Sequence, residues 1–262
     1  MDIESLYHSY LVQADNLREK DRELFHASSA GSCLRKQMYN YYDYPHDEKD
    51  KKSYRILRLG TIVHKDIEEA IAHYCTEFMN NDGNKQVFIE DKIELKELSV
   101  VGTYDVGKLD MEENRFTLWD IKTAAAYKWT TKFGRKQNRK PSSDTNYKLQ
   151  LGTYALGINQ KYKVSKVEMY LLWYNKNTSQ IREQLVSPEW IEKALEYWAT
   201  VNETLEDCGK FFAGGGSTHL HTETEDDLKP GYWEGVPYQD WECRYCQFYS
   251  ICPSNLADKK RY

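Results

Sequence analysis

The sequence predicts an α/β protein in which a mixed central β-sheet is flanked by helices. Three observations point to this fold. Apolar residues recur at helical spacing in three long segments, namely residues 55–79, 146–159 and 188–206. Between them the spacing changes to the alternation of strands, and turn residues separate the strands. Helices and strands therefore alternate along the chain, as they do in layered α/β folds.

The first third of the chain is predicted to be helical. We expect helices over residues 2–25, over a segment that is capped at Ser28 or Ser29 and runs through Cys33 to about Tyr41, and over residues 55–79. Ser28 and Ser29 resemble N-caps of the second helix, because their hydroxyls can accept hydrogen bonds from the first helical N–H groups. The charged residues 43–52 predict a surface loop.

The strands follow. We expect them at residues 86–96, 98–109, 115–122, 164–174 and 179–186. A turn at residues 112–114 predicts that the first three form an antiparallel meander. Ser187, as N-cap, and Pro188, at the first helical position, open a last helix that runs to about Glu206.

Composition and charge exclude several classes of protein. With 262 residues, 40% hydrophobic, 14 Gly and 6 Pro, the chain is neither collagen-like nor disordered. We expect one domain over residues 1–262, with its core at about 55–206. The net charge of −5 argues against coating of nucleic acid by bulk charge but is compatible with a local basic channel. No apolar run is long enough for a membrane span and the N-terminus is acidic, so we expect a soluble, cytoplasmic protein (in the host cytoplasm if it is viral).

Two acidic residues and a lysine form the first candidate site. Asp105 lies in the second predicted strand, and Asp120 and Lys122 end the third, two residues apart and therefore on one face. Two neighbouring carboxylates repel each other unless a cation lies between them, and oxygen ligands suit Mg²⁺ or Mn²⁺. A lysine beside such a cation can orient a water molecule and stabilise charge on a phosphate. Alone, this D-x-K pattern is weak, because it also occurs on solvated strands.

Two helical motifs accompany the acidic residues and the lysine. Gly60 and His64 lie four residues apart on one helix face, with Glu68 a further turn along. Gln150 and Tyr154 share the same spacing on a later helix. Taken singly, His64 is most simply a helix-surface histidine and Tyr154 a core residue. It is their combination with the acidic residues that points to a site.

In this order and in these elements, the motifs resemble the RecB-like branch of the PD-(D/E)xK nucleases. The resemblance spans roughly residues 28–253 and implies a restriction-endonuclease-like core and metal-dependent cleavage of DNA. Two departures are visible, since Tyr104 occupies the place of the signature proline and Asp120 replaces the commoner Glu. Neither change removes a ligand.

The resemblance also assigns roles to individual residues. It implies metal binding by His64, Asp105, Asp120 and the backbone carbonyl of Ile121. It implies a catalytic set of Lys122, Asp120, Asp105, Gln150 and Tyr154, in which the lysine helps to activate water and the last two contact DNA or support the site. An imidazole ligand favours Mn²⁺ over Mg²⁺.

Clustered cysteines predict a second centre. Cys243, Cys246 and Cys252 lie close together in the sequence, and Cys33 is the candidate fourth ligand of a four-cysteine site for zinc or a [4Fe–4S] cluster. Such a site would join segments at about 28–42 and 240–255. The iron–sulfur kind of RecB-like nuclease, which includes the CRISPR-associated Cas-four exonucleases, places its cysteines similarly, and this resemblance favours a structural [4Fe–4S] cluster. Cys75 and Cys208 are most simply buried thiols.

A basic segment predicts how DNA is held. Residues 128–140 contain six basic residues, no acidic ones, and the aromatic residues Trp129 and Phe133. Charge neutralisation with base stacking is typical of single-strand binding, and a flexible, solvated loop is an equally weighted alternative. We therefore expect a single-stranded DNA exonuclease, with a helicase or CRISPR-adaptation proteins as potential partners. The alternatives are a DNA-end-binding adaptor with little cleavage of its own and, more weakly, a redox-sensing iron–sulfur protein.

Overall fold

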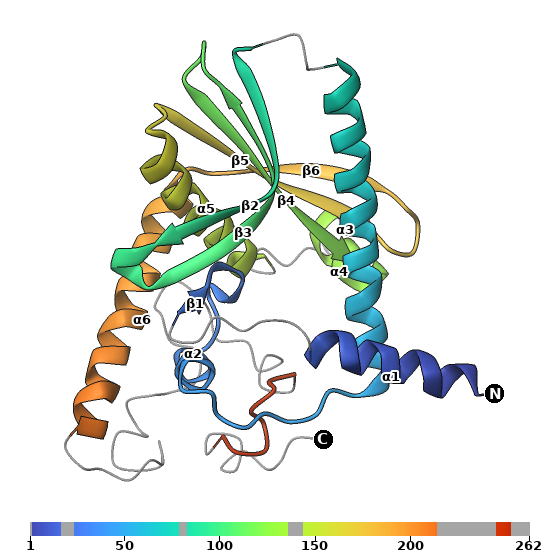
Figure 1. Cartoon of the computed structure of the whole chain (residues 1–262), viewed down its shortest axis with the longest axis vertical. Coiled ribbons are helices and arrows are strands. Elements are labelled where there is room, and N and C mark those ends of the chain that lie inside the picture. The colour runs from blue at the N-terminus through green and yellow to red at the C-terminus, as the bar shows by residue number, and fades with distance from the viewer. Residues whose placement is uncertain (1, 17–23, 79–82, 136–143, 214–244, 253–262) are drawn as a thin grey trace.

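A computed structural model describes residues 2–16, 24–78, 83–135, 144–213 and 245–252. Its centre is a mixed six-stranded sheet, as predicted, in the order β1-β3-β4-β5-β6 with β2 also paired to β3 (Figure 1). The strands are β1 (Phe25–His26), β2 (Lys85–Leu95), β3 (Val100–Asp110), β4 (Arg115–Ala124), β5 (Lys166–Asn175) and β6 (Ile181–Val186). The predicted antiparallel meander is confirmed, because β3 pairs antiparallel with both β2 and β4.

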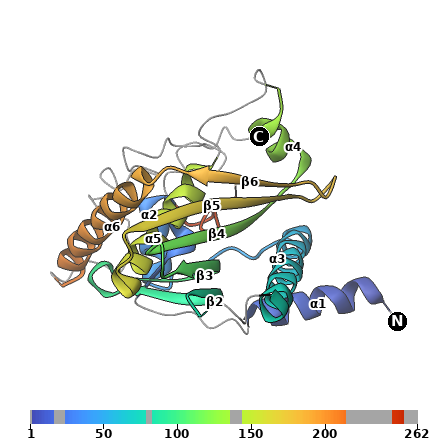
Figure 2. The same cartoon turned by 90° about the horizontal axis from the view of Figure 1, so that it is seen from above.

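Helices cover this sheet. They are α1 (Ile3–Asn16), α2 (Leu34–Tyr41), α3 (Lys51–Phe78), α4 (Ala126–Phe133), α5 (Thr145–Tyr162) and α6 (Glu189–Ala213), with 3-10 turns η1 (Ala27–Ser29) and η2 (Lys96–Leu98). The buried helix α5 packs on the sheet and α6 packs on α5, whereas α3 and α1 lie toward the other end of the strands (Figure 2). None of the helices in the described part of the chain is both long and apolar enough to cross a bilayer.

The N-terminal prediction is partly wrong. Helix α1 ends at Asn16, and Phe25, predicted to be helical, begins β1; residues 17–23 lie outside the described residues. The free edge of β3 explains the difference, because Phe25 N donates to Ser99 O at 2.7 Å and the Phe25 ring is buried against Tyr41 and Trp198. Tertiary pairing thus overrides helical periodicity here.

Two further helices begin at a different residue in the structure than the sequence predicts. Ser29 lies in η1, and α2 begins only after Cys33, which occupies its N-cap position without a side-chain cap. Helix α6 begins at Glu189, one residue after the predicted start at Pro188. Helix α4, which we did not predict, overlaps the start of the basic segment.

The sheet splits beside β4. Pairing between β3 and β4 ends at Val106–Trp119, while β4 continues beside β5 as far as Ala124–Asn175. Beyond the split, β2 and β3 curve away from β4 (Figure 1). Glu90, in the middle of β2, has φ +49°, and the regular pairing of β2 with β3 is interrupted at this position. Irregular strand geometry of this kind re-aims side chains and is common next to functional sites.

Helix α3 turns a polar side toward the sheet. A Cβ at Gly60 would lie 3.4 Å from Thr123 Oγ1 of β4, and Glu68, two turns along, is buried. Members of the apolar stripe of this helix, such as Ile56 and Leu59, are instead 47% and 45% exposed. The orientation of α3 therefore brings its polar side chains to the split in the sheet.

The contact between α5 and α6 is close enough to require a glycine. A Cβ added at Gly152 would overlap the carbonyl oxygen of Trp190 and lie 3.0 Å from Ala194 Cβ. Trp198 Nε1 crosses the same contact and donates to Thr153 Oγ1 at 2.8 Å, where both side chains are buried. This packing fixes α5, and with it the polar side chains that α5 directs toward the sheet.

We therefore expect Gly152→Ala to destabilise the protein. Alanine gains ~1 kcal/mol of helix propensity over glycine, but the overlapping atom belongs to the backbone and overpacking costs roughly 1–3 kcal/mol. Urea unfolding should show a lower midpoint with an unchanged slope. Gly83→Ala is the control, since a Cβ at Gly83 meets nothing within 4 Å. Equal midpoints for the two variants would contradict the packing argument.

Candidate active site

The candidate site forms where the sheet splits. Asp105 stands on β3 at the point of separation, and its Oδ2 accepts a hydrogen bond from Ile121 N of β4 at 2.5 Å. The Asp105 carboxylate thus accepts the hydrogen bond that a backbone carbonyl of β3 would accept from Ile121 N if the two strands were still paired. This contact brings the Ile121 backbone into the site through its N–H group, and the role of its carbonyl oxygen as a ligand stays a prediction.

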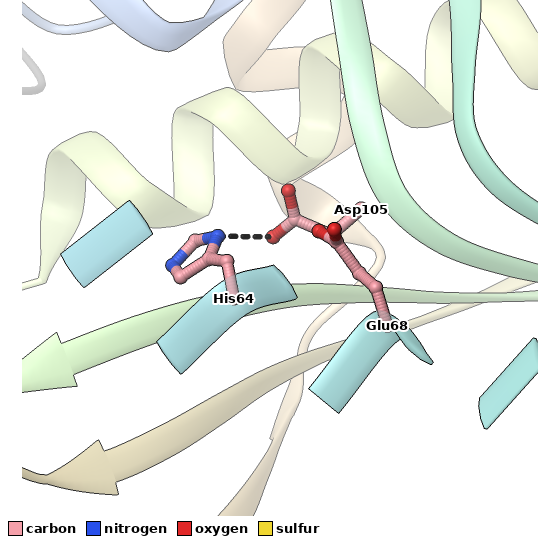
Figure 3. Close-up of side chains that lie close together, drawn as sticks. All are labelled: His64, Glu68 and Asp105. Atoms are coloured by element: carbon pink, nitrogen blue, oxygen red, sulfur yellow. Dashed lines mark ion pairs between the residues drawn. The ribbon is translucent and has the colours of Figure 1, made fainter. Parts of the chain in front are cut away.

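Helix α3 adds two side chains to Asp105. His64, Glu68 and Asp105 each offer one donor atom, and these atoms lie within 4.8 Å of one another (Figure 3). His64 Nδ1 is 3.7 Å from Asp105 Oδ2. Glu68 was not among the predicted ligands. Its spacing, one turn beyond His64, is the sequence signal that could have identified it.

A second group of side chains surrounds Asp120. Lys122 Nζ lies 2.6 Å from Asp120 Oδ2 and donates to Gln150 Oε1 at 3.1 Å. Gln150 Nε2 in turn donates to Tyr154 Oη at 2.7 Å and to Asp120 Oδ1 at 3.3 Å. The structure therefore brings together all four of these predicted residues. Asp120 is not part of the group formed by the candidate ligand atoms of His64, Glu68 and Asp105.

Electrostatics set this site apart from an ordinary surface. Burial, with the Asp105 charge adding to it, raises the pKa of Asp120 to about 6, although Lys122 opposes the shift. Burial also opposes charge on Lys122, but Asp120 and Asp105 outweigh it and hold the pKa of the lysine above its ordinary value. Burial, then the charges of Glu90 and Asp105, raises the pKa of Glu68. Several carboxylates are thus gathered where their mutual repulsion is costly.

A divalent cation fits this arrangement. Asp120 Oδ2 is buried and, apart from its ion pair with Lys122, accepts no hydrogen bond from the described residues. Carboxylate oxygens and an imidazole nitrogen are the donors that Mg²⁺ or Mn²⁺ takes, and a cation among them would offset their repulsion. His64, Glu68, Asp105 and Asp120 are therefore the candidate ligands.

Tyr104, at the place of the signature proline, contacts the site through its ring. It is fully buried, and its hydroxyl donates to Asp91 Oδ2 at 2.9 Å. Its ring packs edge-on against Tyr154, with ring centroids 6.3 Å apart. The departure from the motif thus adds a link between β3 and α5.

The candidate cysteine centre is described in part. Cys33, at the start of α2, lies near Cys246 and Cys252, and no disulfide joins these three. Burial raises the pKa of the Cys246 thiol, and the other two thiols raise it further. The buried guanidinium of Arg35 directs Nη1 to Cys252 Sγ at 3.9 Å. The three thiols fit a shared centre, whereas Cys243 lies outside the described residues.

The basic segment is only partly as predicted. Residues 136–143 lie outside the described residues, and residues 126–133 form α4. Stacking of bases on Trp129, one of the two open alternatives, does not fit this structure, because the ring is 8% exposed and packs against Phe133 with ring centroids 4.8 Å apart. A ring of this size is more stable in the core than on a solvated loop. Lys128 of α4 nevertheless lies beside the site, since its Nζ and the Nζ of Lys122 are 5.3 Å and 5.0 Å from the centroid of the same Tyr147 ring.

Comparison with known proteins agrees with this geometry. A family model described as the PD-(D/E)XK nuclease superfamily matches residues 5–253. No curated protein matches the chain. Among solved structures, SSO0001 has a TM-score of 0.52 at 16% identity, covering 97% of this chain and 98% of that chain. The alkaline exonuclease LHK-Exo from Laribacter hongkongensis has a TM-score of 0.42 at 12% identity, covering 74% and 93%. The first likeness supports the fold, and the second is too distant to support more.

Glu68 gives the sharpest test of the ligand set. A ligand that binds only the folded protein stabilises it, by about 2.7 kcal/mol at a hundred times its Kd. We expect Mn²⁺ to raise the melting temperature of the wild type and Glu68→Gln to lose much of this rise. Asp66→Asn is the matched control, because Asp66 is exposed on the same helix, two residues from His64 and from Glu68. A full Mn²⁺ shift in Glu68→Gln would exclude Glu68 as a ligand.

Proposed function

The chain belongs to the PD-(D/E)XK nuclease superfamily, and from that membership we propose that it is a metal-dependent DNA nuclease that degrades single strands from an end. The observation that carries the proposal is the gathering of His64, Glu68 and Asp105 beside the ion pair of Asp120 and Lys122. Members of this superfamily hydrolyse phosphodiesters with divalent metals. Preference for single strands and for ends is supported by the resemblance of the motifs to RecB-like exonucleases and by Lys128, which lies over the same Tyr147 ring as Lys122.

The carboxylates and the histidine would hold the metal. When bound, Mg²⁺ or Mn²⁺ supplies a Lewis acid that polarises the phosphate and lowers the pKa of water. The Ile121 N–H fixes Asp105 at one side of the split, and Gln150 fixes Asp120 at the other. Both carboxylates are thus oriented before substrate arrives, which lowers the cost of assembling the site.

Lys122 would act as a cation rather than as a base. Its pKa is held above the ordinary value by Asp120 and Asp105 against the effect of burial, so its ammonium group stays protonated near neutral pH. A protonated lysine can donate to the attacking water and to a phosphate oxygen. Attack forms one bond from the water oxygen to phosphorus and breaks the bond from phosphorus to the leaving ester oxygen. The attacking water loses one proton to solvent and the leaving oxygen takes one up from solvent, so the step balances. Gln150 and Tyr154 keep the ammonium group in position.

Cleavage of end-labelled DNA tests this function. We expect the wild type to release label from linear single-stranded DNA with Mn²⁺ and not with EDTA. Lys122→Ala should lower the rate roughly 10²-fold or more, because a donor that stabilises developing charge is removed. Separate labels at the two ends give the polarity of cleavage.

The matched control is Lys166→Ala. Lys166 begins the neighbouring strand β5, and its side chain is exposed. Wild-type rates in Lys122→Ala would contradict the mechanism. Intact DNA in every reaction, with tight binding to DNA ends, would contradict the nuclease and favour an adaptor that only binds ends.

We further propose that Cys33, Cys243, Cys246 and Cys252 hold a structural [4Fe–4S] cluster. Support comes from the three thiols that the structure gathers and from the buried Arg35 guanidinium, whose positive charge suits a centre of thiolates. Zinc is the alternative that the same four ligands would accept.

Metal analysis distinguishes a [4Fe–4S] cluster from a zinc site. We expect protein purified without oxygen to contain iron and acid-labile sulfide, and Cys246→Ser to lose most of both. Cys75→Ser is the control, because Cys75 lies on α3, apart from the other three thiols. Stoichiometric zinc without iron would replace the proposed cluster with a zinc site.

A further inference from the structure

We propose that Tyr147 of α5 is a positioning residue for the lysine of the active site. The face of its aromatic ring holds the ammonium group of Lys122 in the place from which it acts on the scissile phosphate. The inference rests on the proposed function and adds a residue that none of the sequence motifs contains. Tyr147 is a positioning residue because it acts through Lys122.

The ammonium group of Lys122 has two polar partners and one aromatic neighbour. Nζ lies 2.6 Å from Asp120 Oδ2 and donates to Gln150 Oε1 at 3.1 Å. The centroid of the Tyr147 ring is 5.0 Å from the same Nζ, within the range of cation–π contacts. The Lys122 side chain is 15% exposed, so little water competes with the ring. Cation–π attraction is stronger where water is largely excluded.

One side of α5 carries Tyr147 together with the predicted motif residues. Tyr147, Gln150 and Tyr154 follow one another at i, i+3 and i+7, which places them on the same side of a helix. Gln150 Nε2 and Tyr154 Oη are joined by a hydrogen bond. The functional side of α5 therefore extends one turn beyond Gln150, and this turn contacts Lys122.

The Tyr147 ring is itself held in place by the sheet. It packs edge-on against Trp173 of β5, with ring centroids 5.7 Å apart, and Trp173 is 1% exposed. Trp173 is also the residue of β5 that lies opposite Lys122 in the pairing of β4 with β5. The same two strands thus carry the lysine and support the ring. Lys128 Nζ of α4 lies 5.3 Å from the same centroid, so ammonium groups from two elements lie against this ring.

An uncharged partner suits Lys122 because its carboxylate partner has a second role. Asp120 is a candidate metal ligand, so a divalent cation at this carboxylate weakens the ion pair with Lys122 and repels the ammonium group. The aromatic ring attracts an ammonium group through its quadrupole and has no net charge. Tyr147 therefore holds the lysine without depending on Asp120.

Cleavage kinetics give the first test of the inference. Tyr147→Leu should lower kcat roughly tenfold with little change in KM, because the lost contact is made to the lysine and not to DNA. Tyr147→Phe keeps the ring and should restore most of the rate. Tyr127→Leu is the matched control, since Tyr127 is 71% exposed on the neighbouring α4.

NMR of the metal-free protein gives a second test that does not depend on activity. With isotope-labelled lysine, the ε-CH₂ signal of Lys122 is assigned by its absence in Lys122→Ala. We expect this signal to show a ring-current shift in the wild type and in Tyr147→Phe, and to lose the shift in Tyr147→Leu.

Each outcome supports or overturns the proposal. A rate and a Lys122 signal in Tyr147→Leu equal to those of Tyr127→Leu would overturn it. So would an equal loss in Tyr147→Phe, because the hydroxyl and not the ring would then matter. If urea unfolding shows Tyr147→Leu to be unstable, a fluorinated phenylalanine at position 147 replaces it, since it keeps the shape of the ring and weakens its negative face. A wild type that does not cleave DNA would refute the nuclease, and the NMR signal would still decide whether Tyr147 holds Lys122.

Discussion

The hydrogen bond from Ile121 N to Asp105 is the contact on which the site depends. Where β3 leaves β4, a backbone donor in the middle of the sheet loses its partner, and an unsatisfied donor there would be costly. Asp105 satisfies it and is thereby fixed at the edge of the opening. The same opening leaves the end of β4 without a strand partner on one side. Gln150 of α5 can therefore contact Asp120 and Lys122. One irregularity in strand pairing thus positions both carboxylates.

The surrounding structure stabilises a site that is unfavourable by itself. Burial raises the pKa of Asp120 and of Glu68, which means that their charged forms are destabilised in the metal-free protein. Close packing elsewhere offsets this cost, as at the contact of Gly152 with Trp190. Helix α3 shows the same compromise, since its polar side lies toward the sheet and Ile56 of its apolar stripe stays exposed. Groups gathered against their own electrostatic preference are typical of functional sites.

Much of the fold was predictable, because local patterns specify it. The alternation in β2 to β4 and the turn at residues 112–114 reflect interactions between sequence neighbours. The motif residues were predictable for a related reason, since their spacing places them on shared faces. Two features were not predictable locally. Phe25 pairs with an edge that the remote β3 provides, and the Trp129 ring is buried, packing against Phe133 of the same helix, rather than exposed.

The crossover from β4 to β5 has a consequence for how this protein can change in evolution. Parallel neighbours need only about a dozen residues to connect them, whereas this connection runs from residue 125 to residue 165 and contains α4 as well as α5. All four candidate metal ligands, His64, Glu68, Asp105 and Asp120, precede the crossover. Helix α4 also lies inside it, on an excursion that the sheet does not require. The candidate metal ligands and α4 are therefore encoded in separate stretches of the gene, and insertions or deletions around α4 can be selected without changing the ligands.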